Sequence, residues 1–167
     1  MSLSVIHTRA ALGVKAPLVT VEVHISAGLP GLTIVGLPET TVKEARDRVR
    51  SALINSGYEF PAKKITINLA PADLPKEGGR YDLPIAIALL AASEQLSASH
   101  LGEYEFVGEL ALTGALRGVP GAISAAIEAL GCKRKIIVAP DNGPEVGLIN
   151  KEGCLVAYHL QEVCAFL

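Results

Sequence analysis

The hydrophobic and polar positions of this chain follow two periods, and the shorter period predicts strands. Val21, Val23 and Ile25 alternate with polar residues, as in a strand with one buried face. Other short apolar runs are bounded by glycine, proline or polar residues, which is also typical of strands. Strands are therefore predicted at residues 4–11, 18–26, 32–35, 64–69, 106–110, 114–119, 135–138 and 155–159.

The longer period predicts helices. Apolar residues recur three and four positions apart from Thr41 to about Gly57, and Thr41 and Glu44 have the spacing of a capping box. The segment 82–92 is almost wholly apolar, so a helix there must be buried on most of its circumference. The remaining helices are predicted at residues 121–130, 144–149 and 161–167.

The order of these elements predicts the fold class. Strands follow one another early in the chain and alternate with helices later, which indicates an α/β protein of the α+β type, with a mixed β-sheet layered with helices. No linker or long repeat interrupts the pattern, so residues 1–167 are expected to form a single domain. The last residues, 163–167, are apolar and carry no helix stop, which suggests a longer protein.

Composition narrows the classes of function. Half of the residues are hydrophobic and 19% are charged, as in a well-packed globular protein. The net charge of -2 provides no general attraction to nucleic acid, so any DNA contact needs a local basic patch. The chain has no apolar run of about 20 residues and no signal peptide, which predicts a cytoplasmic protein without a membrane partner. Its three cysteines and four histidines lack ligand spacing, so no metal site is expected.

Three blocks of sequence resemble the N-terminal region of the ComM/YifB family of magnesium-chelatase-like proteins. They are IVGLPETTVKE at 34–44, RVRSA at 48–52 with NSG at 55–57, and INLAPADLPKEGGRYDLPIA at 67–86. The resemblance implies a fold like the Lon proteolytic domain, also called ribosomal protein domain 2-like. It also implies that a AAA+ ATPase module and a C-terminal magnesium-chelatase-like module lie outside these 167 residues.

The same resemblance implies a function for the parent protein. The family's members are expected to form hexamers and, in naturally transformable bacteria, to drive branch migration as a helicase when incoming DNA is recombined. The partners implied for this domain are its own AAA+ module, neighbouring subunits of a homo-hexamer, and DNA. No P-loop motif occurs in the chain, so ATP and Mg²⁺ are expected only in the AAA+ module and no cofactor is expected in this domain.

The implied Lon-like fold raises the question of peptidase activity. Lon-type enzymes use a serine activated by a lysine that loses its proton in a desolvated pocket. Matching their serine loop to residues 75–82 places Arg80 at the nucleophile position, and an arginine cannot attack a carbonyl. Continuing the match from residues 107–114 places Ile123 at the lysine position. The resemblance therefore implies no catalytic residues, and Lys76 with another serine is the one dyad left open.

A basic stripe on the predicted helix is the first candidate contact surface. At 100° per residue, Lys43, Arg46 and Arg50 fall within roughly 60° of one another. They could neutralise DNA phosphates or bind acidic groups of a neighbouring subunit. Acidic residues share this helix, so an ordinary solvated face is the alternative interpretation.

The loop at residues 76–82 is the second candidate. Its paired glycines and its N–H groups near a helix start could bind an anion, and Lys76 and Arg80 could contact DNA or a neighbouring subunit. Alternatively, Asp82 caps its own helix and Arg80 pairs with Asp73, Glu77 or Asp82, in which case the loop is structural.

Three functions remain open from the sequence. The domain could assist DNA contact or ring assembly in a AAA+ helicase for natural transformation and recombination. It could instead recruit a partner in a magnesium-chelatase-like remodelling ATPase, or serve as a scaffold that sets ring geometry. The resemblance favours the DNA-processing function, because motor subunits of true magnesium chelatases generally lack a Lon-like N-terminal domain.

Overall fold

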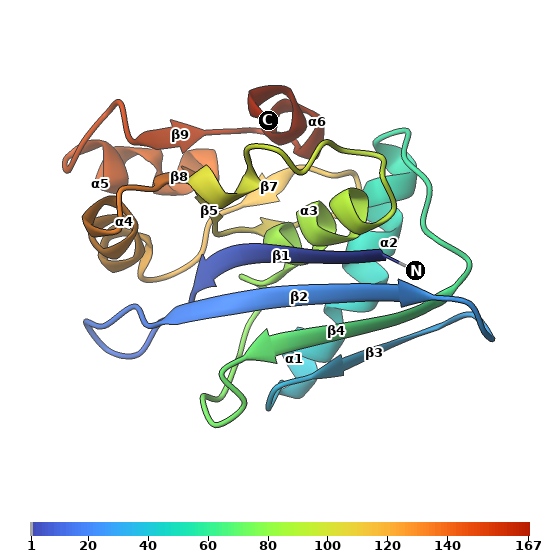
Figure 1. The fold of residues 1–167 in the computed structure, drawn as a ribbon. Helices are drawn as coiled ribbons and strands as arrows, with labels where there is room; N and C mark the ends of the chain where they lie inside the picture. The colour runs from blue at the N-terminus through green and yellow to red at the C-terminus, as the bar shows by residue number, and fades with distance from the viewer. Residues whose placement is uncertain (1) are drawn as a thin grey trace.

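A computed structural model describes residues 2–167, which form a main sheet of seven strands flanked by helices (Figure 1). Its strand order is β3-β4-β2-β1-β5-β8-β9, and β6 pairs with β7 in a separate two-stranded sheet. The strands are β1 (Ser2–Arg9), β2 (Leu18–Ser26), β3 (Gly31–Val35), β4 (Lys64–Ala70), β5 (Tyr104–Phe106), β6 (Glu109–Leu110), β7 (Leu116–Arg117), β8 (Lys135–Val138) and β9 (Cys154–Val156).

The main sheet is mixed, as the sequence predicted. β2 runs antiparallel to both β1 and β4, whereas the pairs β3–β4, β1–β5, β5–β8 and β8–β9 are parallel. Along β2, every second side chain is buried, because alternate residues of a strand point to opposite faces. The α/β class with a mixed sheet is therefore confirmed.

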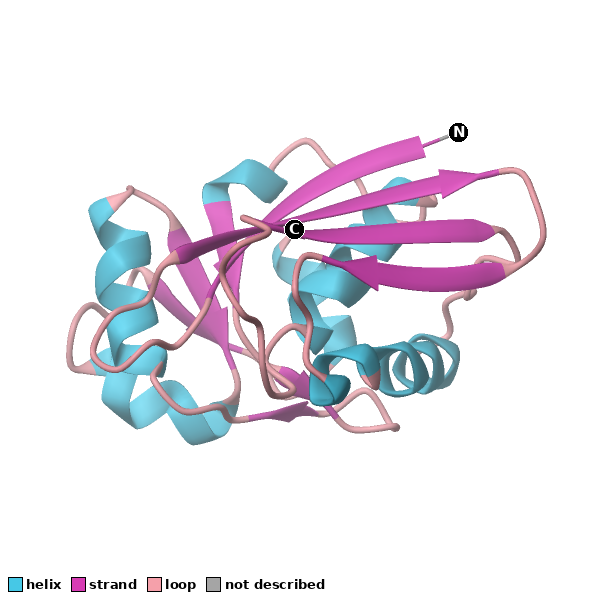
Figure 2. Cartoon of the chain, turned by 90° about the horizontal axis from the view of Figure 1, so that it is seen from below, coloured by secondary structure: helices cyan, strands magenta, loops and turns pink. Residues whose placement is uncertain are grey.

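Two helices cover one face of the four long strands. The α-helices are α1 (Thr40–Lys43), α2 (Ala45–Asn55), α3 (Asp82–Ala92), α4 (Ala122–Gly131), α5 (Gly143–Gly147) and α6 (Leu160–Phe166), with short 3-10 turns η1 (Leu101–Glu103) and η2 (Pro140–Asn142). Figure 1 shows α2 and α3 behind β1, β2, β3 and β4, and in the view of Figure 2 the helices lie below these long strands, with no described helix over their opposite face. All but one of the 11 residues of α3 are buried, which confirms the prediction from its apolar composition.

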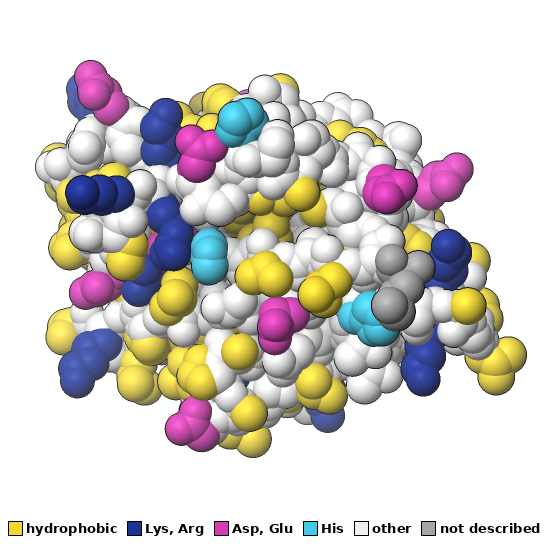
Figure 3. All heavy atoms as spheres, viewed as in Figure 1, with side chains coloured by type: hydrophobic (Ala, Val, Ile, Leu, Met, Phe, Trp, Pro, Cys, Tyr) yellow, Lys and Arg dark blue, Asp and Glu magenta, His cyan; other side chains and the backbone are white. Residues whose placement is uncertain are grey.

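The uncovered face of these strands is mostly uncharged. Leu3 and Val5 of β1 lie exposed, with 66% and 44% of their surface accessible. Figure 3 shows this face with mainly hydrophobic and uncharged side chains around an acidic one in the middle, and several basic side chains toward α4. Within residues 2–167, no helix has the length and apolar character needed to cross a membrane.

The predicted capping box is wrong. Glu39 is the N-cap residue of α1 and makes no side-chain capping bond, while the Thr41 hydroxyl accepts a hydrogen bond from the Gly78 N–H at 2.9 Å. The helix predicted as continuous from Thr41 is interrupted at Glu44, which ends α1 and precedes α2. Thr41 therefore anchors the loop before α3 instead of its own helix.

The strand predicted at 106–110 is divided between two sheets. After β5, the Val107 N–H still donates to Ile137, but the Gly108 N–H donates to the carbonyl oxygen of Arg80. The chain thus leaves the main sheet at Gly108 and enters β6, which pairs with a β7 shorter than predicted. This departure brings the β6–β7 hairpin beside the loop before α3.

Candidate functional site

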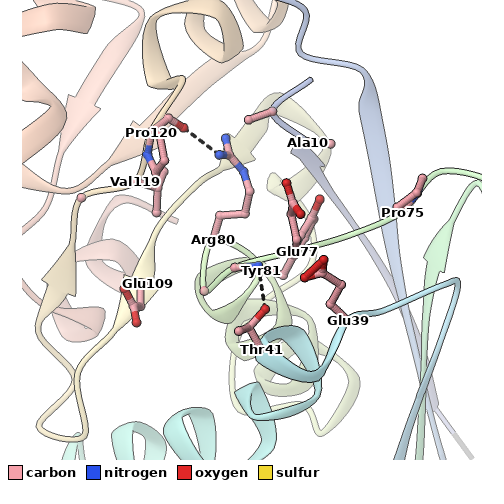
Figure 4. A pocket seen from close by; sticks show the side chains of 14 residues that line it. Ala10, Glu39, Thr41, Pro75, Glu77, Arg80, Tyr81, Glu109, Val119 and Pro120 are labelled. Atoms are coloured by element: carbon pink, nitrogen blue, oxygen red, sulfur yellow. Dashed lines mark hydrogen bonds between the residues drawn. The ribbon is translucent and has the colours of Figure 1, made fainter. Parts of the chain in front are cut away.

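A pocket of about 390 Å³ lies at the N-terminal end of α3 (Figure 4). Among the segments that line it, three meet around Arg80: the link after β1 at Ala10, the loop before α3 at Gly78 to Arg80, and the link between β7 and α4 at Pro120. The second of these is the loop that the resemblance matches to the Lon serine loop, so the pocket contains Arg80, the residue matched to the nucleophile position.

Arg80 lies at the junction of these three segments. Only 5% of its surface is exposed, its Nε donates to the carbonyl oxygen of Arg9 at 2.9 Å, and its Nη1 donates to that of Pro120 at 2.7 Å. Its Nη2 has no hydrogen-bond partner among residues 2–167. Burial lowers the pKa of Arg80, because the charged form loses water. The predicted pairing of Arg80 with a carboxylate is therefore wrong: two backbone carbonyls hold the guanidinium.

Lys76 lies inside the protein with no exposed surface. Its Nζ donates to the carbonyl oxygen of Gly36 at 2.6 Å and also to that of Pro71. Burial lowers the pKa of Lys76, while nearby Asp73 raises it. These hydrogen bonds from the Lys76 ammonium group join the loop to the ends of β3 and β4. In this conformation Lys76 presents no surface to DNA or to a neighbouring subunit.

Asp82 does not cap its helix, contrary to the simpler of the two sequence interpretations. Tyr81 is the N-cap residue of α3 and makes no side-chain capping bond. The buried carboxylate of Asp82 accepts two hydrogen bonds from Arg48, at 2.7 and 3.1 Å, and one from the Leu110 N–H at 3.1 Å. Burial raises the pKa of Asp82 to about 6, although the bonds from Arg48 act in the opposite direction. Asp82 thereby joins α2, α3 and β6.

Three carboxylates line the same pocket as Arg80. They are Glu39, Glu77 and Glu109. Desolvation and the neighbouring Glu77 carboxyl group raise the pKa of Glu39. The Glu109 side chain packs against Gly79 so closely that a Cβ at that position would come within 2.8 Å of it. The pocket therefore combines one buried cation with an acidic rim.

Ile123, which the resemblance matches to the position of the Lon lysine, lies at the start of α4. Ile123 is 38% exposed in the first turn of this helix, and Ser124 beside it is half-buried. The hydrogen bond from Arg80 to Pro120 joins the loop before α3 to the segment that leads into α4. The structure thus brings Arg80 next to the segment that carries Ile123, and neither side chain offers a nucleophile or a base.

The basic stripe is divided by the helix break. Lys43, Arg46 and Arg50 are all exposed, but Lys43 belongs to α1 and the two arginines belong to α2. Arg46 and Arg50 line a shallow pocket of about 210 Å³ together with Lys63, and the Arg50 guanidinium lies 5.9 Å from the centroid of the Phe60 ring. Sequence reasoning missed Lys63, although the adjacent Lys63 and Lys64 at the start of β4 were a visible signal.

Sequence reasoning also missed a buried ion network. Glu105 is fully buried and accepts from Arg9 at 2.7 and 2.9 Å and from Arg134 at 3.0 Å. These residues lie far apart in the sequence, so spacing could not have revealed the network. Among residues 2–167, no three His, Cys, Asp or Glu side chains are placed to share a metal ion.

Comparison with known proteins places these residues in a family context. The profile described as ChlI, the subunit ChlI of Mg-chelatase, matches residues 21–142. The protein YifB of Escherichia coli (strain K12) is 84% identical over 167 residues, which cover 100% of this chain and 33% of YifB. The competence protein ComM of Haemophilus influenzae is 60% identical over the same 100% of this chain and 33% of its own length. The chain therefore spans about a third of these relatives.

Proposed function

Because the chain belongs to the ComM/YifB family, which shares the profile of the Mg-chelatase subunit ChlI, we propose that it is a non-catalytic accessory domain of a larger AAA+ ATPase. In this proposal the domain has a Lon-like fold, and the parent is a hexameric helicase that moves DNA branches in natural transformation and recombination. ATP and Mg²⁺ bind in the AAA+ module. The name of one relative, competence protein ComM, supports the link with transformation.

One observation carries the non-catalytic part of the proposal: Arg80, which the resemblance matches to the nucleophile position, is held by two carbonyl oxygens. The segment it contacts leads to Ile123, which the same resemblance matches to the position of the activating lysine. Lys76, the one lysine that could replace that base, donates to backbone oxygens and to no serine. A serine–lysine dyad requires a hydroxyl within hydrogen-bond reach of its base, and none of these contacts supplies it.

The exposed basic residues support the contact part of the proposal. Lys43, Arg46 and Arg50 project from α1 and α2, and Lys63 adds a fourth charge beside the two arginines. Phosphate contacts of this kind act through charge and are weakened by salt. In the assembled parent these residues bind DNA or acidic groups of a neighbouring subunit.

A second candidate function is supported by the ChlI match itself. The profile covers residues 21–142, which include most of the sheet and all the residues that line the Arg80 pocket except Ala10 and Ala11. On this basis the domain would recruit a partner for a magnesium-chelatase-like remodelling ATPase, or act as a scaffold for its ring.

Deletion of residues 1–167 from the full-length parent separates these functions. Hexamer formation, ATP hydrolysis and unwinding of branched DNA are measured side by side. Loss of DNA unwinding with intact rings supports DNA contact, and loss of rings supports a role in assembly. Unchanged behaviour in all three assays contradicts the proposed function and leaves partner recruitment.

The basic surface has a matched test in the same parent. Replacing Lys43, Arg46 and Arg50 with alanine is expected to weaken DNA binding or assembly by about tenfold or more, because each lost phosphate contact lowers the salt-dependent affinity. The control replaces three exposed lysines near α4 and β9, which removes the same charge; they are Lys133, Lys135 and Lys151. Equal loss in both variants, or loss in the control alone, contradicts the placement of the contact on α1 and α2.

A further inference from the structure

The Arg80 pocket contains a charged donor that the protein itself leaves unsatisfied. The guanidinium is buried, two of its nitrogens donate to carbonyl oxygens, and Nη2 donates to no acceptor within residues 2–167. A buried charged donor without an acceptor is destabilising, so a bound anionic group that accepts from it is favoured. Figure 4 shows Arg80 in the middle of the residues that line the pocket.

The backbone beside Arg80 adds donors of the same kind. Gly79 and Arg80 line the pocket just before α3, a helix of 11 residues, and their N–H groups donate to no acceptor in the described chain. These two residues precede the N-cap residue of α3, so their free N–H groups lie beside the positive end of the helix dipole, which also favours an anion. Both the side chain and the backbone of the loop therefore point to an anionic ligand group at the base of the pocket.

The carboxylates on the rim of the pocket favour a cationic group on the ligand. Figure 4 shows Glu39 and Glu77 together on one side of Arg80 and Glu109 on the other. A purely anionic ligand such as phosphate would be repelled by these carboxylates, and a purely cationic ligand would be repelled by Arg80. The complement of the pocket is one molecule with an anionic group for Arg80 and a cationic group for the rim.

We propose that this pocket binds a ligand that carries both a carboxylate and a basic side chain, as the C-terminal arginine or lysine of a peptide does. The carboxylate accepts from Arg80 and from the N–H groups before α3, while the guanidinium or ammonium group lies between Glu39 and Glu77. Pro75, Tyr81 and Pro120 supply apolar surface for the aliphatic part of that side chain. The volume of about 390 Å³ lies in the range of small-ligand pockets. This site is separate from the basic residues of α1 and α2.

Binding of three N-acetylated probes tests the proposal on the 167-residue chain by NMR titration. The first probe, N-acetylarginine, carries both charges. The second, N-acetylargininamide, lacks the carboxylate, and the third, N-acetylcitrulline, lacks the cation. We expect saturable binding of N-acetylarginine and at least about tenfold weaker binding of the other two, since each lacks one charge-assisted contact. Absence of saturable N-acetylarginine binding, equal binding of all three probes, or binding of inorganic phosphate at the same affinity overturns the proposal.

The source of the ligand and the role of the rim are tested in the same titration. Tighter binding of Ala-Ala-Arg than of free arginine identifies a peptide end, and the reverse identifies the free amino acid. Glu77→Gln is expected to weaken binding of N-acetylarginine by about tenfold, because it removes a charge from the rim. Glu128→Gln, an exposed position on α4, is the matched control and leaves the affinity unchanged. Equal effects of the two substitutions contradict the proposed site, whereas the deletion experiment on the parent tests the accessory function independently.

Discussion

Buried charged residues account for the most specific contacts in this protein. Glu105 is held by two arginines, Asp82 by one arginine, and Arg80 by carbonyl oxygens alone. Buried charges need partners because the loss of water is large and is offset only by well-placed hydrogen bonds. The loss of stability caused by a substitution therefore depends on which buried charge is left without its hydrogen-bond partner.

The network around Glu105 gives the first prediction. Glu105→Gln leaves the buried guanidinium of Arg9 without a counter-charge, so the free energy of unfolding should fall by about 3 kcal/mol. Urea unfolding of the variant and of the unmodified chain measures the change. The matched control is Glu103→Gln, whose carboxylate makes an exposed pair with His100 and should change stability by less than about 1 kcal/mol. A similar effect of both substitutions would contradict this role of Glu105.

The buried carboxyl group of Asp82 gives a prediction on pH. Its pKa is about 6 in the folded chain against 3.8 as the ordinary value, so the folded chain binds this proton more tightly. The group therefore favours folding below about pH 4, and that contribution is lost as the pH rises through about 6. The unfolding free energy of the unmodified chain, measured relative to Asp82→Asn, should fall by about 2 kcal/mol between pH 4 and pH 7. If the stability of the unmodified chain relative to Asp82→Asn rises with pH instead, the hydrogen bonds from Arg48 outweigh burial in setting the pKa of Asp82, and the prediction is wrong.

At the scale of elements, the sequence predicted the bounds of those helices and strands that depend on their own residues alone. The bounds of β2, α3 and β8 agree with the predicted 18–26, 82–92 and 135–138, because alternation, apolar composition and length are local properties. The predictions of the capping box and of the strand at 106–110 were wrong, because hydrogen bonds to residues distant in the sequence replaced the local ones. The Thr41 hydroxyl binds Gly78, and the Gly108 N–H binds Arg80.

The turn between β3 and α1 gives a prediction at this scale. Gly36 has a φ of 105°, and a Cβ there would clash with the carbonyl oxygen of Leu69 on the neighbouring strand. Gly36→Ala should therefore lower the unfolding free energy by more than about 2 kcal/mol. Gly131→Ala is the matched control: that glycine ends α4 with no atom within 4 Å of an added Cβ, and alanine should be neutral or stabilising by up to about 1 kcal/mol. Equal melting temperatures of the two variants would contradict this account of the turn.

At the scale of the whole molecule, the site combines a residue that the resemblance identified with partners that it could not. The match to the Lon loop singled out Arg80, and Arg80 lies in the pocket. Its partners, Arg9 and Pro120, are 71 and 40 residues away in the sequence, and no spacing rule connects them. The carboxylates Glu39 and Glu109 reach the same pocket only because the sheet and the β6–β7 hairpin bring their segments together.

The absence of peptidase activity is the central claim, and hydrolysis of casein by the purified chain tests it most directly. The account predicts no hydrolysis above that of a protein-free blank, because the resemblance matches Arg80 and Ile123 to the positions of nucleophile and base, and neither side chain can serve in those roles. The same assay is run on Lys76→Ala, with circular dichroism to show that the variant is folded. Hydrolysis by the unmodified chain that is lost in a folded Lys76→Ala variant would contradict the account.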